Sequence, residues 1–145
     1  MAEAMERRLQ AILNDPKLNC TQRLCLLVEN VGGTMSRVSP SMLRDLQRNA
    51  PAVYARIDAI RQRNIPRFFG RIIRDGIAEG TIRPDADPEF TIEFWMQAIR
   101  GLLDPETLER RNLTPQQTIA RAGELFFRGL LTPSGREQFA EHQKN

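Results

Sequence analysis

The chain has 145 residues, of which 41% are hydrophobic and 27% charged, so it is long enough to form one domain around its own core. Its 21 basic and 18 acidic residues are interspersed, and this balance predicts no concentrated basic surface for nucleic acid. No apolar run is long enough to span a membrane and the N-terminal residues lack the apolar core of a signal peptide, so we expect a cytoplasmic protein outside the membrane.

The first two predicted helices cover residues 2–14 and 20–36. Residues 2–14 carry an apolar stripe at helical spacing but begin without a capping residue, as if the helix continued from a longer one. Thr21 is the expected N-cap of the second helix. Gly32 and Gly33 interrupt its apolar pattern; we expect a break or kink there, with room for a ligand or a close helix as the alternative.

Two further helices are predicted over residues 40–49 and 51–79. Ser39 is placed to cap the first of them, since Pro40 at the first helical position needs no N–H donor. The longer helix contains Pro66, which removes one backbone hydrogen bond and favours a kink. Asn64 lies within the apolar stripe of this helix, where it either satisfies a backbone group freed by the proline or faces a ligand.

A well-marked turn follows the long helix. Gly80 supplies the left-handed residue that ends a helix, and Pro84 bars its continuation. Asp87 then caps a helix over residues 88–103, with Pro88 at its first position. This helix is apolar almost all round, which indicates burial on more than one side.

The remaining predicted elements are a connector over residues 105–113 with one helical turn, a helix over 115–131, and a polar, frayed tail over 132–145. Thr114 and Gln117 form a capping box at the start of residues 115–131. No segment alternates with the two-residue period of a strand. The fold class is therefore predicted to be all-α, a bundle of five to six helices.

Residues with catalytic or metal-binding chemistry are scarce. The only histidine, His142, lies in the polar tail, and no carboxylates pair on an apolar face. Asp87 and Glu89 are explained as helix-capping residues. Cys20 and Cys25 point to different sides of a helix, which predicts buried reduced thiols rather than a disulfide or metal site. We expect no enzyme activity, no metal and no cofactor.

The helices over 88–103 and 115–131 both carry small residues among large apolar ones. Such a pair leaves more apolar surface than a monomer tolerates, and packing it against a second copy makes a four-helix interface. The alternative is that both helices are monomer core. The candidate interface residues are Phe94, Ala98, Gly101, Leu102, Ile119, Ala122, Gly123, Phe126, Phe127 and Leu130.

Apolar faces of the earlier helices are candidates for enclosing a ligand cavity, because methionines and aromatic residues suit adaptable apolar ligands. Each of these residues is alternatively ordinary core. Two polar members, Arg61 and Asn64, are candidates to select a polar group on the ligand. The candidate pocket residues are Val31, Met35, Met42, Leu46, Tyr54, Ile57, Arg61, Asn64, Phe68 and Trp95.

Several motifs occur together in a characteristic order: LRDLQRNAPAVYARIDAIRQ at 43–62, IIRDGIAEGTIRPDADPEF at 72–90, GLLDPETL at 101–108 and GLLTPSGRE at 129–137. In this order the chain resembles the C-terminal regulatory domain of TetR/AcrR-family transcriptional regulators. In that family a long helix commonly ends in Gly-x-Ala-Glu-Gly, followed by Arg-Pro-Asp and an Asp-Pro-Glu helix start. The helix-turn-helix head of the family is absent from these residues.

The resemblance implies a single regulatory domain over 1–145. Residues 1–14 would be the end of the connecting helix, 15–80 the ligand-pocket helices, 87–131 the dimerisation helices and 132–145 a tail. It implies a homodimer whose intact form is a repressor that a small apolar or amphipathic effector releases from operator DNA. Operator DNA would be bound only through the missing head. A free-standing helical binding or adaptor protein without DNA binding is the alternative.

Overall fold

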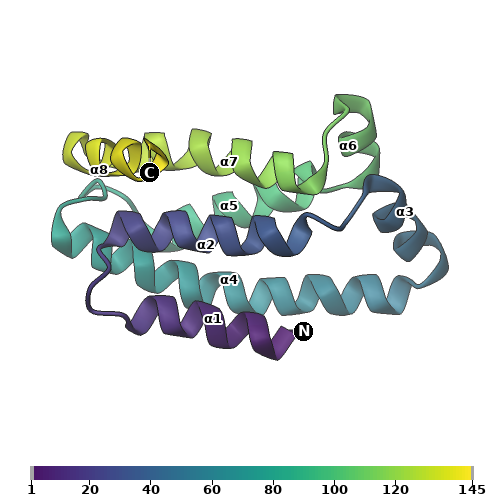
Figure 1. The fold of residues 1–145 in the computed structure, drawn as a ribbon. Helices are drawn as coiled ribbons and strands as arrows, with labels where there is room; N and C mark the ends of the chain where they lie inside the picture. The colour runs from purple at the N-terminus through teal and green to yellow at the C-terminus, as the bar shows by residue number, and fades with distance from the viewer. Residues whose placement is uncertain (1, 145) are drawn as a thin grey trace.

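Residues 2–144, which the computed structural model describes, form eight α-helices and no strand (Figure 1). The predicted all-α fold is therefore confirmed, whereas the predicted number of five to six helices is wrong. None of the helices in this range is both long and apolar enough to cross a membrane. The helices are α1 (Ala2–Asn14), α2 (Cys20–Met35), α3 (Pro40–Asn49), α4 (Pro51–Glu79), α5 (Pro88–Leu102), α6 (Pro105–Arg111), α7 (Pro115–Leu130) and α8 (Pro133–Lys144).

The helix α2 lies at the centre of the bundle. Figure 1 shows α7 and α8 along one side of it and α4 and α1 along the other. The helix α5 packs against both α4 and α7. The two short helices α3 and α6 pack together at one end, where the Arg44 guanidinium forms an ion pair with Glu109.

The turn after α4 follows its sequence signals closely. Gly80 has a left-handed backbone, with φ of 82°, and its N–H bonds to carbonyls of the last turn of α4. Asp87 caps α5 by accepting hydrogen bonds from the backbone of Glu89 and Phe90. Pro66 lies inside α4 without ending it, so α4 runs as one helix.

The start and the middle of α2 differ from the prediction. Asn19, rather than Thr21, is the N-cap, and it forms a capping box with Gln22. Thr21 is fully buried and its hydroxyl donates to Gln138 Oε1 in α8. The helix continues through Gly32 and Gly33, so the expected break is wrong. Packing of α2 against its neighbours outweighs the intrinsic cost of the two glycines.

The connector and the tail are helices rather than a single turn and a frayed end. In α6, Pro105 and Leu108 are buried, and Asn112 ends the helix in a left-handed conformation. At α8, the Thr132 hydroxyl accepts a hydrogen bond from the Gly135 N–H. Phe139 is 6% exposed and packs edge-on against the Phe127 ring. Burial of this one aromatic residue anchors a segment whose composition is otherwise polar.

The core is built around an aromatic cluster from α4, α5 and α7. Trp95 stacks on Phe69 at 5.8 Å and on Phe127 at 5.9 Å between ring centroids, and Phe126 lies against all three rings. Offset and edge-on arrangements of this kind add to the stabilisation from burial alone.

Both cysteines lie inside the core as free thiols. Burial raises the pKa of Cys20 and of Cys25 from the ordinary value of 9.0 to about 12 in each case. The thiols are therefore protonated near neutral pH and behave as small apolar side chains.

Two helical glycines offer a matched stability test. Gly33 has no atom within 4 Å of an added Cβ, so Gly33→Ala is expected to raise the free energy of unfolding by about 0.5–1 kcal/mol. At Gly76 the added Cβ would lie 2.5 Å from Cys20 Sγ and 2.6 Å from Ile82 Cδ1, so Gly76→Ala is expected to lower it by about 1–3 kcal/mol. Urea unfolding of both variants would measure these changes. Shifts of the same sign would contradict the packing described for α2 and α4.

Candidate ligand pocket

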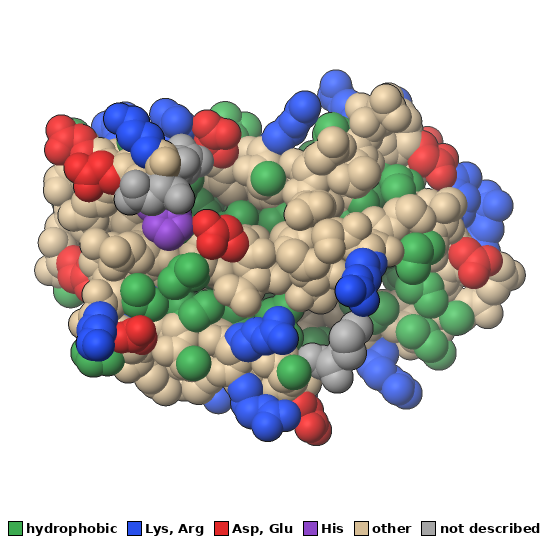
Figure 2. Space-filling model, in the orientation of Figure 1, with side chains coloured by type: hydrophobic (Ala, Val, Ile, Leu, Met, Phe, Trp, Pro, Cys, Tyr) green, Lys and Arg blue, Asp and Glu red, His purple; other side chains and the backbone are tan. Residues whose placement is uncertain are grey.

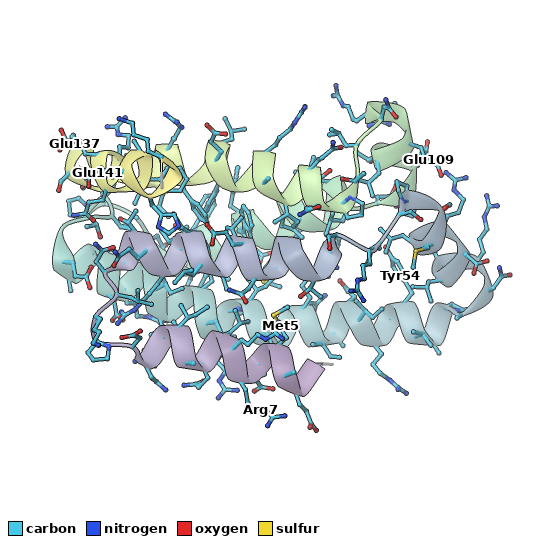
Figure 3. All side chains as sticks on the ribbon, viewed as in Figure 1. Met5, Arg7, Tyr54, Glu109, Glu137 and Glu141 are labelled. Carbon is cyan, nitrogen blue, oxygen red and sulfur yellow. The ribbon has the colours of Figure 1, made fainter. Side chains whose placement is uncertain are left out.

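A cavity of about 270 Å³ lies between α1, α2, α4, α5 and α7. Its wall is almost entirely apolar, and Figure 3 shows Met5 of α1 beside the neighbouring helix α4. The volume is close to the lower end of the range for small-molecule sites. The lining residues are Met5, Leu9, Leu27, Val28, Val31, Thr34, Met35, Ile57, Ile60, Arg61, Asn64, Ile65, Phe68, Phe69, Trp95, Ile99, Leu103, Ile119 and Phe127.

The middle of α4 supplies the longest wall of the cavity. Its lining residues recur at three- and four-residue intervals, which places them on one face of the helix. Along this face exposure falls from Ile57, which is 40% exposed, to Phe68, which is 2% exposed. Thr34, on the facing side of α2, is also exposed. The cavity therefore reaches the surface between α2 and α4 and ends in the aromatic core.

Most of the predicted pocket residues share this cavity. Seven of the ten line it: Val31, Met35, Ile57, Arg61, Asn64, Phe68 and Trp95.

The other three do not line the cavity. Met42 is 50% exposed on α3, and Leu46 is half-buried on the same helix. Tyr54 belongs to the first turn of α4, and its side chain lies between α4 and α3 near one end of the bundle (Figure 3). The reason is that α3 packs on the first turns of α4 and on α6, away from the cavity.

The family resemblance implies that the connecting helix, which is α1, borders the pocket, but the candidate residues did not include Met5 and Leu9 of its apolar stripe, which line the cavity. Sequence reasoning also assigned Ile119 and Phe127 to a dimer interface, although both line the cavity and are at most 3% exposed. A stripe of large apolar residues marks a buried helix face but does not identify which neighbour covers it.

Three polar residues, Thr34, Arg61 and Asn64, interrupt the apolar wall, and the last two lie on α4. Burial lowers the pKa of Arg61, and the positive charge of Arg100 lowers it further, against the opposing effects of Asp58 and Tyr54. The Asn64 Oδ1 is buried without a hydrogen-bond partner among the described residues. A backbone carbonyl freed by Pro66 would need an N–H donor, so this oxygen could not satisfy it.

An apolar groove lies at the surface between α5 and α7. Of the predicted interface residues, Phe94 is 57% exposed and Leu102 is 37% exposed, and Gly101 is also on the surface. Ala98, Ala122 and Phe126 are half-buried in the groove, and Leu130 is mostly buried at its edge. Prediction had overlooked two exposed residues of the same groove, Phe90 and Leu125.

Three of the predicted interface residues are oriented toward their own chain. Ile119 and Phe127 line the cavity, and Gly123 is buried beside the Val28 side chain. These positions belong to the core of the chain because α7 packs on α2 as well as on α5. The predicted interface residues that remain accessible on α5 and α7 therefore form a smaller set than the ten predicted.

The remaining charged groups have local structural roles. Asp85 pairs with Arg83 at 2.8 Å, and this guanidinium holds the pKa of the Asp85 carboxyl below its usual range. His142 Nε2 lies 3.0 Å from Glu29 Oε1. Within residues 2–144 no group of three or more His, Cys, Asp or Glu residues is arranged to hold a metal ion. Figure 2 shows acidic and basic side chains mixed over the visible face, without a patch of one sign.

Comparison with known proteins found no matching family model, no matching curated protein and no matching solved structure.

Proposed function

We propose that this chain is the effector-binding and dimerisation domain of a TetR-like transcriptional regulator. The observation that carries the proposal is the apolar cavity between α1 and the helices α2, α4, α5 and α7. Its size, its apolar wall and its few polar groups are the common features of a small-molecule site. The effector is a small apolar or amphipathic molecule.

The position of α1 supports a regulatory role. Met5 and Leu9 of this helix form part of the cavity wall, so a bound molecule would contact α1 directly. In the family that the sequence resembles, the corresponding helix connects the pocket to the DNA-binding head. If α1 can take up two positions, one with the operator bound and one with it released, a ligand that contacts α1 better in the second position would shift the equilibrium toward it. The operator would then be released. Operator binding would require the helix-turn-helix head, which is not part of these 145 residues.

A cavity-filling substitution tests the effector site. A thermal-shift screen of small apolar compounds is expected to find ligands, each stabilising the chain by about 2.7 kcal/mol when present at 100 times its dissociation constant. Val31→Phe, on the cavity wall, is expected to abolish these shifts by occupying the space. Val53→Phe is the matched control, because Val53 is 45% exposed outside the cavity and its replacement is expected to leave the shifts unchanged.

Equal ligand shifts in the two folded variants would contradict binding in this cavity. A free-standing binding protein would pass the same test, so a second observation separates the two functions. An in-frame helix-turn-helix encoded directly upstream supports a regulator, whereas its absence from the gene supports a free-standing protein.

A further inference from the structure

Arg61 is the one charged residue among those that line the cavity, and its side chain is half-buried. The carboxylate that acts on its charge is that of Asp58, one turn earlier in α4. That carboxylate is already engaged, since Asp58 Oδ2 accepts from Arg100 Nη2 at 3.1 Å and from Gln62 Nε2 at 3.0 Å. Among the carboxylates that the structure describes, none forms an ion pair with Arg61.

This arrangement leaves an excess of positive charge beside the cavity. Arg61 and Arg100 share one nearby carboxylate, Asp58, and the ion pair with Arg100 partly neutralises it. Burial lowers the pKa of Arg61, yet a guanidinium remains protonated at neutral pH. A charge held in an apolar wall is costly unless an opposite charge and hydrogen bonds accompany it. The site is therefore complementary to an anion.

Asn64 extends the polar site by one helical turn. It follows Arg61 by three positions, which places both side chains on the same face of α4, and both line the cavity. Its buried Oδ1 has no partner, and a half-turn of the amide would present Nδ2 to an acceptor in the same place. One carboxylate, with two oxygens that accept several hydrogen bonds, would satisfy both side chains.

The order of polar and apolar residues along the cavity wall also determines the orientation in which an amphipathic ligand would bind. Ile57 lies at the exposed end of the α4 face, Arg61 and Asn64 follow, and Phe68 and Trp95 close the buried end. A hydrocarbon chain would gain most by lying against the aromatic end, since burial of apolar area is favourable. The charged group would then remain near the opening between α2 and α4.

We propose that the cavity binds an amphipathic monocarboxylate, with its carboxylate on Arg61 and Asn64 and its hydrocarbon chain directed toward Trp95 and Phe68. This proposal rests on the function proposed above, that the cavity binds a small molecule. A single guanidinium and a single amide match one carboxylate. A phosphate monoester would bring more charge and more acceptors than these two side chains can satisfy.

The test compares four probes of equal chain length: decanoate, methyl decanoate, decanol and decyltrimethylammonium. Binding to the unchanged chain is measured by isothermal titration calorimetry. Decanoate is expected to bind about 10- to 100-fold more tightly than methyl decanoate or decanol, because only the carboxylate makes charge-assisted hydrogen bonds. The cationic probe is expected to bind most weakly.

Two variants test whether the preference for decanoate depends on the Arg61 side chain. Arg61→Met is expected to abolish the preference for decanoate while decanol affinity stays within about threefold, since the apolar wall is retained. Arg63→Met is the matched control, because Arg63 is exposed on the same helix outside the cavity and its loss is expected to preserve the preference. The comparison of decanoate with its methyl ester on the unchanged chain does not depend on any variant folding.

The outcomes separate the two proposals. Equal affinities for decanoate, its ester and decanol would overturn the carboxylate proposal and leave the cavity as an apolar ligand site. A preference for decanoate that persists in folded Arg61→Met would overturn the role of Arg61. Failure of all four probes to bind, together with failure of the broader compound screen, would overturn the proposed function itself.

Discussion

Replacement of Phe127 by Ala is expected to lower the free energy of unfolding by about 3–5 kcal/mol, the usual cost of truncating a buried Phe. The Phe127 side chain is 1% exposed and lies at the meeting point of α7, α5, α4 and α8, against Trp95, Phe69 and Phe139. Its loss would remove packing from four helices and enlarge the adjoining cavity. The melting temperature is expected to fall by roughly 10 °C for a domain of this size.

The control for this prediction is Met42→Ala. Met42 is 50% exposed on α3, outside both the cavity and the groove, so its truncation is expected to change stability by less than about 1 kcal/mol. Both variants are compared with the unchanged chain in urea at one protein concentration, because the proposed dimerisation would make apparent stability concentration-dependent. A loss below about 1 kcal/mol for Phe127→Ala would show that Phe127 does not hold the aromatic cluster together.

Helix boundaries were the part of the fold that sequence reasoning predicted best. Asp87 with Pro88, Ser39 with Pro40, and the left-handed Gly80 act through local backbone geometry, so the sequence alone identifies them. The same reasoning was wrong where packing decides. Two glycines inside α2 weaken a helix locally, but contacts with the surrounding helices hold it together.

The tail is a second segment whose structure depends on packing rather than on its local sequence. Residues 133–144 are polar enough to suggest fraying, yet they form α8 because Phe139 docks on Phe127 and Gln138 accepts a hydrogen bond from Thr21. Both partners lie far away along the chain. Local composition carries no information about such contacts, and single-sequence reasoning has no other means of finding them.

The candidate pocket was also predicted only in part, because a sequence pattern identifies the apolar face of a helix but not the helix that covers it. The periodicity of α4 places Ile57, Asn64 and Phe68 on one face, because helical spacing alone determines it, and Arg61 lines the same cavity in the structure. It does not determine whether α1 or α3 covers that face. In the structure α1 covers it, whereas α3 lies at the end of the bundle and Met42 is exposed there.

The groove between α5 and α7 leads to the second large expected effect. The unchanged chain is expected to form a two-fold dimer at micromolar concentration, burying roughly 2,000 Å² or more in total. Leu125→Glu is expected to weaken this dimer by about 100-fold or more, since each copy would place an unpaired charge in an apolar interface. Leu125 is 81% exposed within its own chain, so the substitution is expected to leave the monomer folded.

Sedimentation velocity of the variant and of a matched control measures this effect. Val53→Glu introduces the same charge at a residue that is 45% exposed on α4, outside the groove, and it is expected to remain a dimer. If both variants dissociate equally, general charge repulsion rather than the groove explains the loss. If the unchanged chain sediments as a monomer at micromolar concentration, the groove is not a dimer interface. The dimerisation part of the proposed function would then be wrong. The proposed effector site would be unaffected by that result, because the cavity is formed within one chain by α1, α2, α4, α5 and α7.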